Sequence, residues 1–226
     1  MKITWLGQAG LLLEKNSLKI MIDPYLSDSV EKVNPQNYRR VEVLNELFEI
    51  KPDIMVFTHN HLDHYDPETV RKFITPKTNI TVLAPTSVWN EVRKIGGNNN
   101  YVQFNRHTIW TEKKIEFTAV KAEHSDPAAI GVIIDDGEKK YYITGDTLCN
   151  EEIFIDIPDD IYAVFLPVNG VGNNMNMTDA KRFCDRIKPE FAVPIHCGMF
   201  DKIDMNSFEC KYKVIPKIYE EVRFTK

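Results

Sequence analysis

One short stretch, Thr58-His59-Asn60-His61-Leu62-Asp63-His64, constrains this chain more than any other. It places three histidines and a carboxylate within six residues, directly after the apolar run Ile54–Phe57. Imidazole and carboxylate groups are the ligands of borderline and hard divalent metals. His59 and His61 lie two residues apart, so on extended backbone their side chains point to the same side. The stretch therefore predicts a metal site on the loop that leaves a buried strand.

The residues after this cluster predict a helix. Asp66 is typical of an N-cap, and Pro67 is typical of the first helical position. The cluster would then lie between a strand and a helix, where sites in α/β proteins usually lie. A single histidine is more often an ordinary surface or core residue. Four ligand-type side chains crowded together have little reason to be there without a cation.

The order His59-Asn60-His61-Leu62-Asp63-His64 resembles the HxHxDH signature of the metallo-β-lactamase superfamily. This resemblance implies an α/β (α+β) fold, a four-layer αββα sandwich of two mixed β-sheets. It also implies a hydrolytic site with one or two metals at one edge of the sandwich. The signature itself covers little of the chain, so the remaining ligands must follow in order at strand ends.

Three further ligand-type residues each follow a predicted strand. His124 comes after Ile115–Lys121, Asp146 after Lys140–Thr144, and His196 after Phe191–Ile195. They match the later motifs of the superfamily in order, so the resemblance spans most of the chain. It implies a first metal on His59, His61 and His124, and a second on Asp63, His64 and His196, with Asp146 bridging the two.

Other residues near these motifs leave alternatives open. Asp23 ends a predicted strand and could support a ligand imidazole, or simply form an Asp-Pro turn. Cys197 follows a predicted ligand, but a buried neutral thiol is the more common use of such a cysteine. His107 matches no motif position, so we expect it to be structural or exposed.

Composition bounds the class of protein. The 226 residues suit a single domain spanning 1–226, and 43% hydrophobic residues can fill a large core. A net charge of −5 argues against a broad nucleic-acid-binding face. No apolar run approaches the ~20 residues of a membrane span. The polar N-terminal stretch does not resemble a signal peptide, so we expect a cytoplasmic protein whose four cysteines are reduced thiols.

Several local predictions concern segments around the expected site. Residues Tyr25–Asn37 are predicted to form a loop, and Val41–Ile50 a helix. The polar stretch Gly96–Asn100 is the best candidate for the seam between two halves. Thr178 is the expected N-cap of a helix over Asp179–Lys188, whose start could hold an anion. The preceding segment Asn169–Met177 is either a substrate-contacting loop or an ordinary connector.

The expected function is hydrolysis of a small ester, lactone or phosphoester by a metal-activated hydroxide, with Asp63 orienting the hydroxide or taking its proton. The nitrogen-rich ligands suit Zn²⁺, and Mn²⁺, Fe²⁺ and Ni²⁺ are also compatible. The substrate is expected to be a small molecule, and an anionic one is among the options. The oligomeric state is left open, with a homo-oligomer as one option. Alternatives are a nuclease or phosphodiesterase, a non-catalytic metal-binding module, and di-iron redox chemistry.

A finer resemblance is to the branch containing L-ascorbate-6-phosphate lactonase. It is carried by three short segments, Thr4–Gly10, Ile22–Tyr25 and Met177–Ala180. These segments are less specific than the ligand set, and the compact chain leaves little room for the extensions expected of the lactonase itself.

Overall fold

The computed structural model describes residues 1–225, which form two six-stranded sheets packed face to face. In spatial order, sheet A contains β1 (Lys2–Gly7), β2 (Gly10–Lys15), β3 (Leu18–Ile22), β4 (Ile54–Val56), β5 (Thr81–Ala84) and β6 (Asn100–Gln103). Sheet B contains β12 (Phe191–Ile195), β11 (Ile161–Pro167), β10 (Lys140–Ile143), β9 (Ile130–Asp135), β8 (Ile115–Lys121) and β7 (Ile109–Glu112).

Both sheets are mixed. The strands β1, β2 and β3 pair antiparallel, whereas β3, β4, β5 and β6 pair parallel. In sheet B, β7 to β10 are antiparallel and β10, β11 and β12 are parallel. Parallel neighbours end at the same edge of a sheet, so the loops that follow them gather at one end of the sandwich.

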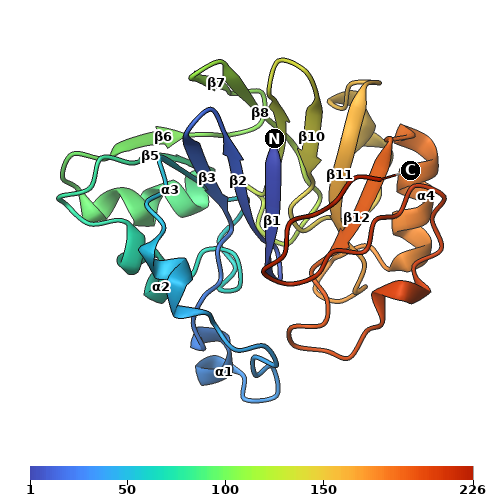
Figure 1. The fold of residues 1–226 in the computed structure, drawn as a ribbon, viewed down its shortest axis with the longest axis horizontal. Helices are drawn as coiled ribbons and strands as arrows, with labels where there is room; N and C mark the ends of the chain where they lie inside the picture. Colours follow the sequence, from blue (N-terminus) through green and yellow to red (C-terminus); the bar gives the residue numbers. More distant parts are fainter. Residues whose placement is uncertain (226) are drawn as a thin grey trace.

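Helices cover the outer faces of the two sheets (Figure 1). Sheet A is flanked by α2 (Pro67–Phe73) and α3 (Thr86–Val92), and sheet B by α4 (Met177–Ile187). The short α1 (Ser29–Val33) projects from the end of the molecule where the site lies. Four 3₁₀ turns complete the described elements, at Asn45–Glu49, Arg93–Ile95, Glu151–Ile155 and Met205–Ser207. The predicted four-layer αββα sandwich is therefore confirmed.

The alternation of side chains along each strand explains the layers. Ile20 and Ile22 of β3 point into the core between the sheets, while Met21 packs toward the helices of sheet A. In β10, Ile143 faces the central core and Tyr142 packs on the α4 side. Because strands of this kind are buried on both faces, they are apolar throughout rather than alternating.

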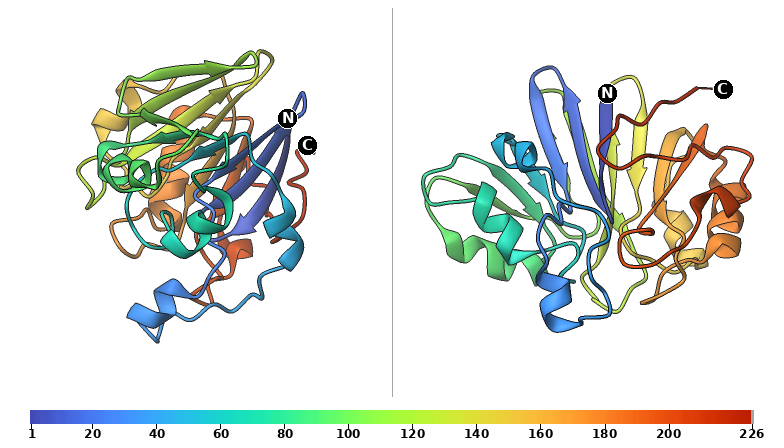
Figure 2. Two further views of the ribbon diagram at one scale, coloured as in Figure 1. Left: turned by 90° about the vertical axis from the view of Figure 1, so that its left-hand side faces the viewer. Right: turned by 60° about the horizontal axis from the view of Figure 1, so that its bottom comes forward.

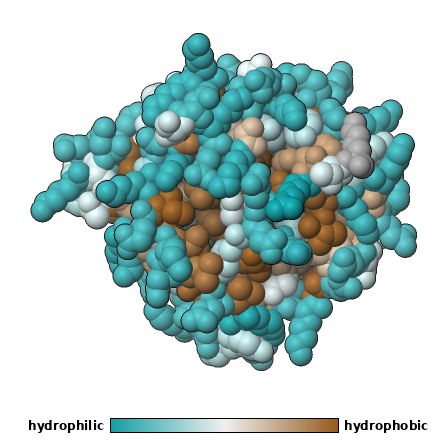
Figure 3. Space-filling view, in the orientation of Figure 1, coloured by the Kyte–Doolittle hydropathy of each residue, from teal (hydrophilic) through white to brown (hydrophobic). Residues whose placement is uncertain are grey.

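The C-terminal tail runs along an edge strand of each sheet (Figures 1 and 2). The backbone N–H of Tyr219 donates to the carbonyl of Trp5 in β1 at 2.7 Å. In the same way, Val214 donates to Ala192 in β12 at 2.8 Å. The space-filling view of this face shows apolar residues between polar ones across the middle of the molecule (Figure 3).

Four local predictions were wrong. Residues 41–50 form only the 3₁₀ turn Asn45–Glu49. Leu47 and Phe48 pack on the outer cluster of sheet A from this single turn, while Leu44 is 42% exposed. The predicted loop Tyr25–Asn37 contains α1. The stretch Gly96–Asn100 is not the seam, because β6 still pairs with β5 in sheet A. The N-cap of α4 is Asn176, not Thr178, and its side chain accepts the N–H of Asp179 at 2.9 Å.

Within the described residues, no helix is both long and apolar enough to cross a membrane.

Candidate metal centre

The loop after β4 is held in place by Asp23, at the end of the neighbouring β3. The Asp23 carboxylate accepts the Thr58 backbone N–H at 2.8 Å and lies 2.8 Å from His64 Nδ1. Asp23 itself has a φ of +42°, an uncommon conformation for a residue other than glycine. Of the two alternatives for Asp23, support of a ligand imidazole is therefore the one that the structure bears out.

Sheet B brings its three predicted ligands to the same place from three separate strand ends. His124 follows β8, Asp146 follows β10 and His196 follows β12. Gly145 makes the approach of the sheets possible, because a Cβ at this residue would lie 2.9 Å from both the Ile130 carbonyl oxygen and the Thr58 Cβ. Its φ of +61° also favours glycine.

The seven predicted ligands form two neighbouring groups, each with ligand atoms within 4.8 Å of one another: His59, His61, His124 and Asp146; and Asp63, His64 and His196. In the first group, His124 Nε2 lies 3.0 Å from His61 Nδ1. In the second, His196 Nε2 lies 3.1 Å from Asp63 Oδ2. The groups are those that the resemblance implied.

Asp146 lies between the two groups. Its Oδ1 is 3.2 Å from Nε2 of both His64 and His196. Its Oδ2 is 4.0 Å from Nε2 of both His59 and His124. One carboxylate oxygen thus faces each group, as a bridging ligand requires.

Two buried atoms of the cluster fit a cation better than a protein partner. His59 Nε2 and Asp146 Oδ1 are both buried and have no hydrogen-bond partner among the described residues. Buried polar atoms are nearly always paired. A divalent cation would use these lone pairs, and the set of five imidazoles and two carboxylates is one that borderline metals accept. The residues present therefore fit a metal.

Burial and charge divide the imidazoles. Burial lowers the pKa of His59 well below its usual value and also lowers the pKa of His124. Burial acts the same way on His64, but Asp146 and Asp23 outweigh it and raise the pKa of His64 well above its usual value. Burial would raise the pKa of Asp63, but the neighbouring His64 and His196 lower it. Neighbouring carboxylates thus favour the charged form of the His64 imidazole, whereas burial disfavours it at His59 and His124.

Comparisons with known proteins agree with this geometry. Residues 19–197 match the family model described as the beta-lactamase superfamily domain. The chain belongs to the metallo-β-lactamase superfamily. A relative from Carboxydothermus hydrogenoformans, named a UPF0173 metal-dependent hydrolase, is 28% identical over 95% of this chain and 93% of its own.

Solved structures show the same fold. The metallo hydrolase Igni18 from Ignicoccus hospitalis has a TM-score of 0.78 at 20% identity, and covers 100% of this chain and 98% of its own. An isothiocyanate hydrolase from Delia radicum gut bacteria has a TM-score of 0.76 at 18% identity, with 100% of both chains covered. The family match and the names of the relatives make this chain a metal-dependent hydrolase of the metallo-β-lactamase superfamily.

Carboxamides that sequence reasoning missed hold the superfamily ligands in position. Gln8, in the turn between β1 and β2, donates from Nε2 to Asp63 Oδ2 at 2.8 Å and also lies 3.1 Å from His196 Nε2. Asn174 donates to Asp146 Oδ2 at 2.9 Å. Both carboxamides are at least 95% buried. The only signal in the sequence was their place in segments already singled out, Thr4–Gly10 and Asn169–Met177.

Two residues that the sequence left outside the site lie outside it. His107 contacts Asp156 at 3.1 Å, with its side chain 69% exposed. Cys197 is fully buried, and burial raises the pKa of its thiol to about 12, which fits the neutral buried thiol rather than a ligand.

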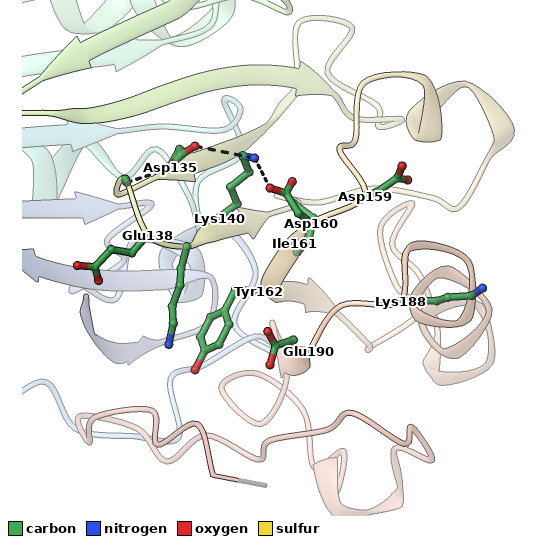
Figure 4. Close-up of a pocket in the computed structure, with 11 residues that line it drawn as sticks. Asp135, Glu138, Lys140, Asp159, Asp160, Ile161, Tyr162, Lys188 and Glu190 are labelled. Carbon is green, nitrogen blue, oxygen red and sulfur yellow. Dashed lines mark hydrogen bonds and ion pairs between the residues drawn. The ribbon is translucent and has the colours of Figure 1, made fainter.

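A pocket of about 280 Å³ opens over the predicted ligands and includes Gln8, Asn169 and Asn174 in its lining. A larger hollow of about 620 Å³ lies at the other end of sheet B (Figure 4). Its walls are charged, and Lys140 pairs there with Asp160 and lies 4.0 Å from Asp135. Because those groups are ordinary exposed ion pairs, we place the chemistry of this superfamily member in the smaller pocket.

Proposed function

We propose that this protein hydrolyses a small-molecule ester, lactone or phosphoester with one or two divalent cations held by His59, His61, Asp63, His64, His124, Asp146 and His196. Zn²⁺ suits the nitrogen-rich set best, and Mn²⁺, Fe²⁺ and Ni²⁺ remain compatible. The observation that carries the proposal is the position of Asp146, whose two oxygens face the two histidine groups.

The described hydrogen bonds prepare the imidazoles for this role. Because a carboxylate only accepts hydrogen bonds, Asp23 fixes the proton of His64 on Nδ1. The lone pair of the ring is then on His64 Nε2, which lies 3.2 Å from Asp146 Oδ1. A carboxylate behind a ligand histidine also raises the basicity of the ring.

Asp63 is the residue that we propose for proton transfer. Gln8 holds one of its oxygens at 2.8 Å, which fixes the carboxylate and leaves lone pairs free to accept a proton. Divalent cations held by the seven predicted ligands would make a nucleophile available at neutral pH, because such cations lower the pKa of bound water from about 15.7 towards 7. Asp63 would accept the proton that such a water gives up and would orient the hydroxide that results.

The likeness to the L-ascorbate-6-phosphate lactonase branch stays a prediction. The pocket of about 280 Å³ can enclose a small molecule but only a small part of a folded nucleic acid. Its size therefore favours a small-molecule substrate. Hydrolysis of nucleic acid and a non-catalytic metal-binding role are the alternatives that the experiment below separates.

The test is metal analysis of the purified protein together with a hydrolysis screen over lactones, aryl esters, thioesters and phosphodiesters. His61→Ala serves as the blank and His107→Ala as the matched control, since His107 lies outside the site. We expect His61→Ala to lose more than about a hundredfold in rate on the preferred class, and His107→Ala to keep it. Equal rates for wild type and His61→Ala on every class would contradict the proposal.

A further inference from the structure

The pocket over the predicted ligands has apolar side chains in its walls. Apart from those ligands, its walls include the apolar side chains of Val30, Val171 and Phe200. Val30 comes from α1, and Val171 from the loop after β11. Val171 is 67% exposed although it is apolar. An exposed apolar side chain at the mouth of a site is a contact for an apolar part of a ligand.

The polar walls of this pocket are almost all uncharged carboxamides. Gln8, Asn37, Asn169 and Asn174 contribute them. Beyond the predicted ligands, Asp201 is the one charged residue among the described residues that line the pocket, and none of them is lysine or arginine. By contrast, Lys140 and other lysines line the distant hollow of Figure 4.

Arg39 and Arg40 do not line this pocket; both donate to backbone carbonyls, and the buried Nε of Arg40 has no partner among the described residues. Arg40 donates to the backbone carbonyl of Phe200 and stacks over the Tyr38 ring at 4.2 Å. Arg39 donates to the carbonyls of Tyr25 and Ser27. Neither guanidinium group is among the residues that line the pocket. A site for phosphate or carboxylate normally supplies such a group, because arginine binds these anions with two parallel hydrogen bonds.

We propose that this pocket selects small uncharged substrates, and that Asp201 is the residue that disfavours anions. The inference rests on the proposed hydrolytic function, and within it favours esters and lactones over phosphoesters. A sphere of 280 Å³ is about 8 Å across, which is close to the Debye length at physiological ionic strength. A charge anywhere in the pocket is therefore close enough to Asp201 to escape full screening.

The backbone holds Asp201 in place. Its Oδ1 accepts the N–H groups of Gly198 and Ile203 at 2.8 and 2.9 Å. Of the predicted ligands, Asp63 and Asp146 would offset two of the four positive charges that two divalent cations bring, and Asp201 would offset a third.

The test uses two aryl acetates of nearly equal size, neutral 4-acetoxybenzamide and anionic 4-acetoxybenzoate. Asp201→Asn removes the charge and keeps Oδ1 as an acceptor for the loop. Asp204→Asn is the matched control, because Asp204 also caps a backbone N–H in the same segment but does not line the pocket. The ratio of kcat/KM for the two esters cancels any general loss of activity in a variant.

We expect wild type and Asp204→Asn to prefer the neutral ester about tenfold at low salt, and Asp201→Asn to reduce this ratio to about twofold. Added salt should narrow the ratio in wild type and change it little in Asp201→Asn. A preference for the benzoate in wild type, or an unchanged ratio in Asp201→Asn, would overturn the inference.

A binding measurement separates this inference from the proposed function. Titration calorimetry with 4-acetamidobenzamide and 4-acetamidobenzoate, whose amides react far more slowly, reports selectivity without turnover. If neither acetoxy ester is hydrolysed faster than by His61→Ala, ester hydrolysis fails as the function. The ratio of the two dissociation constants still decides the inference. Tighter binding of 4-acetamidobenzamide than of 4-acetamidobenzoate, with a smaller difference in Asp201→Asn, supports it. Equal binding of the two ligands overturns it.

Discussion

The two halves of the molecule supply the candidate metal centre in different ways. Sheet A contributes four ligands from one loop of six residues. The carboxylates of Asp23 and Asp126 each accept a backbone N–H of this segment, and Asp23 also contacts a ligand imidazole, that of His64. Sheet B contributes three ligands from three strand ends, separated by 22 residues or more in the sequence. Each of these needs support of its own, such as Asn174 for Asp146 and Asn169 for His196. The ligands of the local set therefore share their supports, with Asp23 contacting both the backbone and an imidazole, whereas each ligand of the dispersed set has a support of its own.

The largest effect is expected from Asp23→Ala, because the loop it braces carries ligands of both groups. We expect metal affinity to fall about a hundredfold at both groups, the upper end for loss of a residue that orients ligands. Competition with a chelator for the metal measures this change in affinity. Asp53→Ala is the control, since Asp53 also accepts a backbone N–H in sheet A, from Lys19 at 2.8 Å, but away from the site. Retention of wild-type affinity in Asp23→Ala would remove the proposed contrast between the halves.

A smaller effect is expected from Asn174→Ala, because it releases one ligand of the dispersed set. Loss of its 2.9 Å hydrogen bond to Asp146 should weaken metal binding about tenfold and lower kcat to a similar extent. Asn60→Ala, which removes an exposed side chain and keeps the backbone bond to Asp126, should change neither quantity. A loss as large as that of Asp23→Ala would show that the two halves are equally sensitive.

The smallest effect is expected from Asp156→Asn, in the connection between β10 and β11 and outside the site. The Asp156 carboxylate accepts from Arg106 at 2.6 Å and from the Lys121 backbone at 2.9 Å. Burial opposes ionisation, but these partners lower the pKa of Asp156 from 3.8 to about 2. The wild type should be about 1 to 2 kcal/mol more stable than the variant at pH 7, which urea unfolding measures.

The sign of this pH dependence follows from the lowered pKa. The stabilisation is fully present above the unfolded pKa of about 3.8, and is lost as the pH falls through the folded pKa of about 2. The two unfolding curves should therefore converge in acid. Metal affinity should be the same in both proteins, and a change in it would mean that Asp156 influences the site.

The same contrast explains how much could be predicted from the sequence. The apolar runs located core strands, with β8 and β12 placed at their observed bounds. The local histidine cluster was recognisable because its members are adjacent. Gln8 could not be recognised as part of the site, because it lies 55 residues from Asp63 and a single carboxamide has no characteristic spacing to other site residues. Helix 41–50 was predicted from apolar spacing alone, and that spacing does not distinguish a helix from the single 3₁₀ turn by which Leu47 and Phe48 reach the sheet A cluster.

The tail along β1 and β12 has a consequence for the solution behaviour of the chain. Its backbone occupies hydrogen-bonding groups that two edge strands would otherwise present to other molecules. Removing residues from Lys211 onward would free both edges together, and each could then pair with a strand of a second copy. Such a shortened chain would tend to aggregate even though every predicted metal ligand is still present.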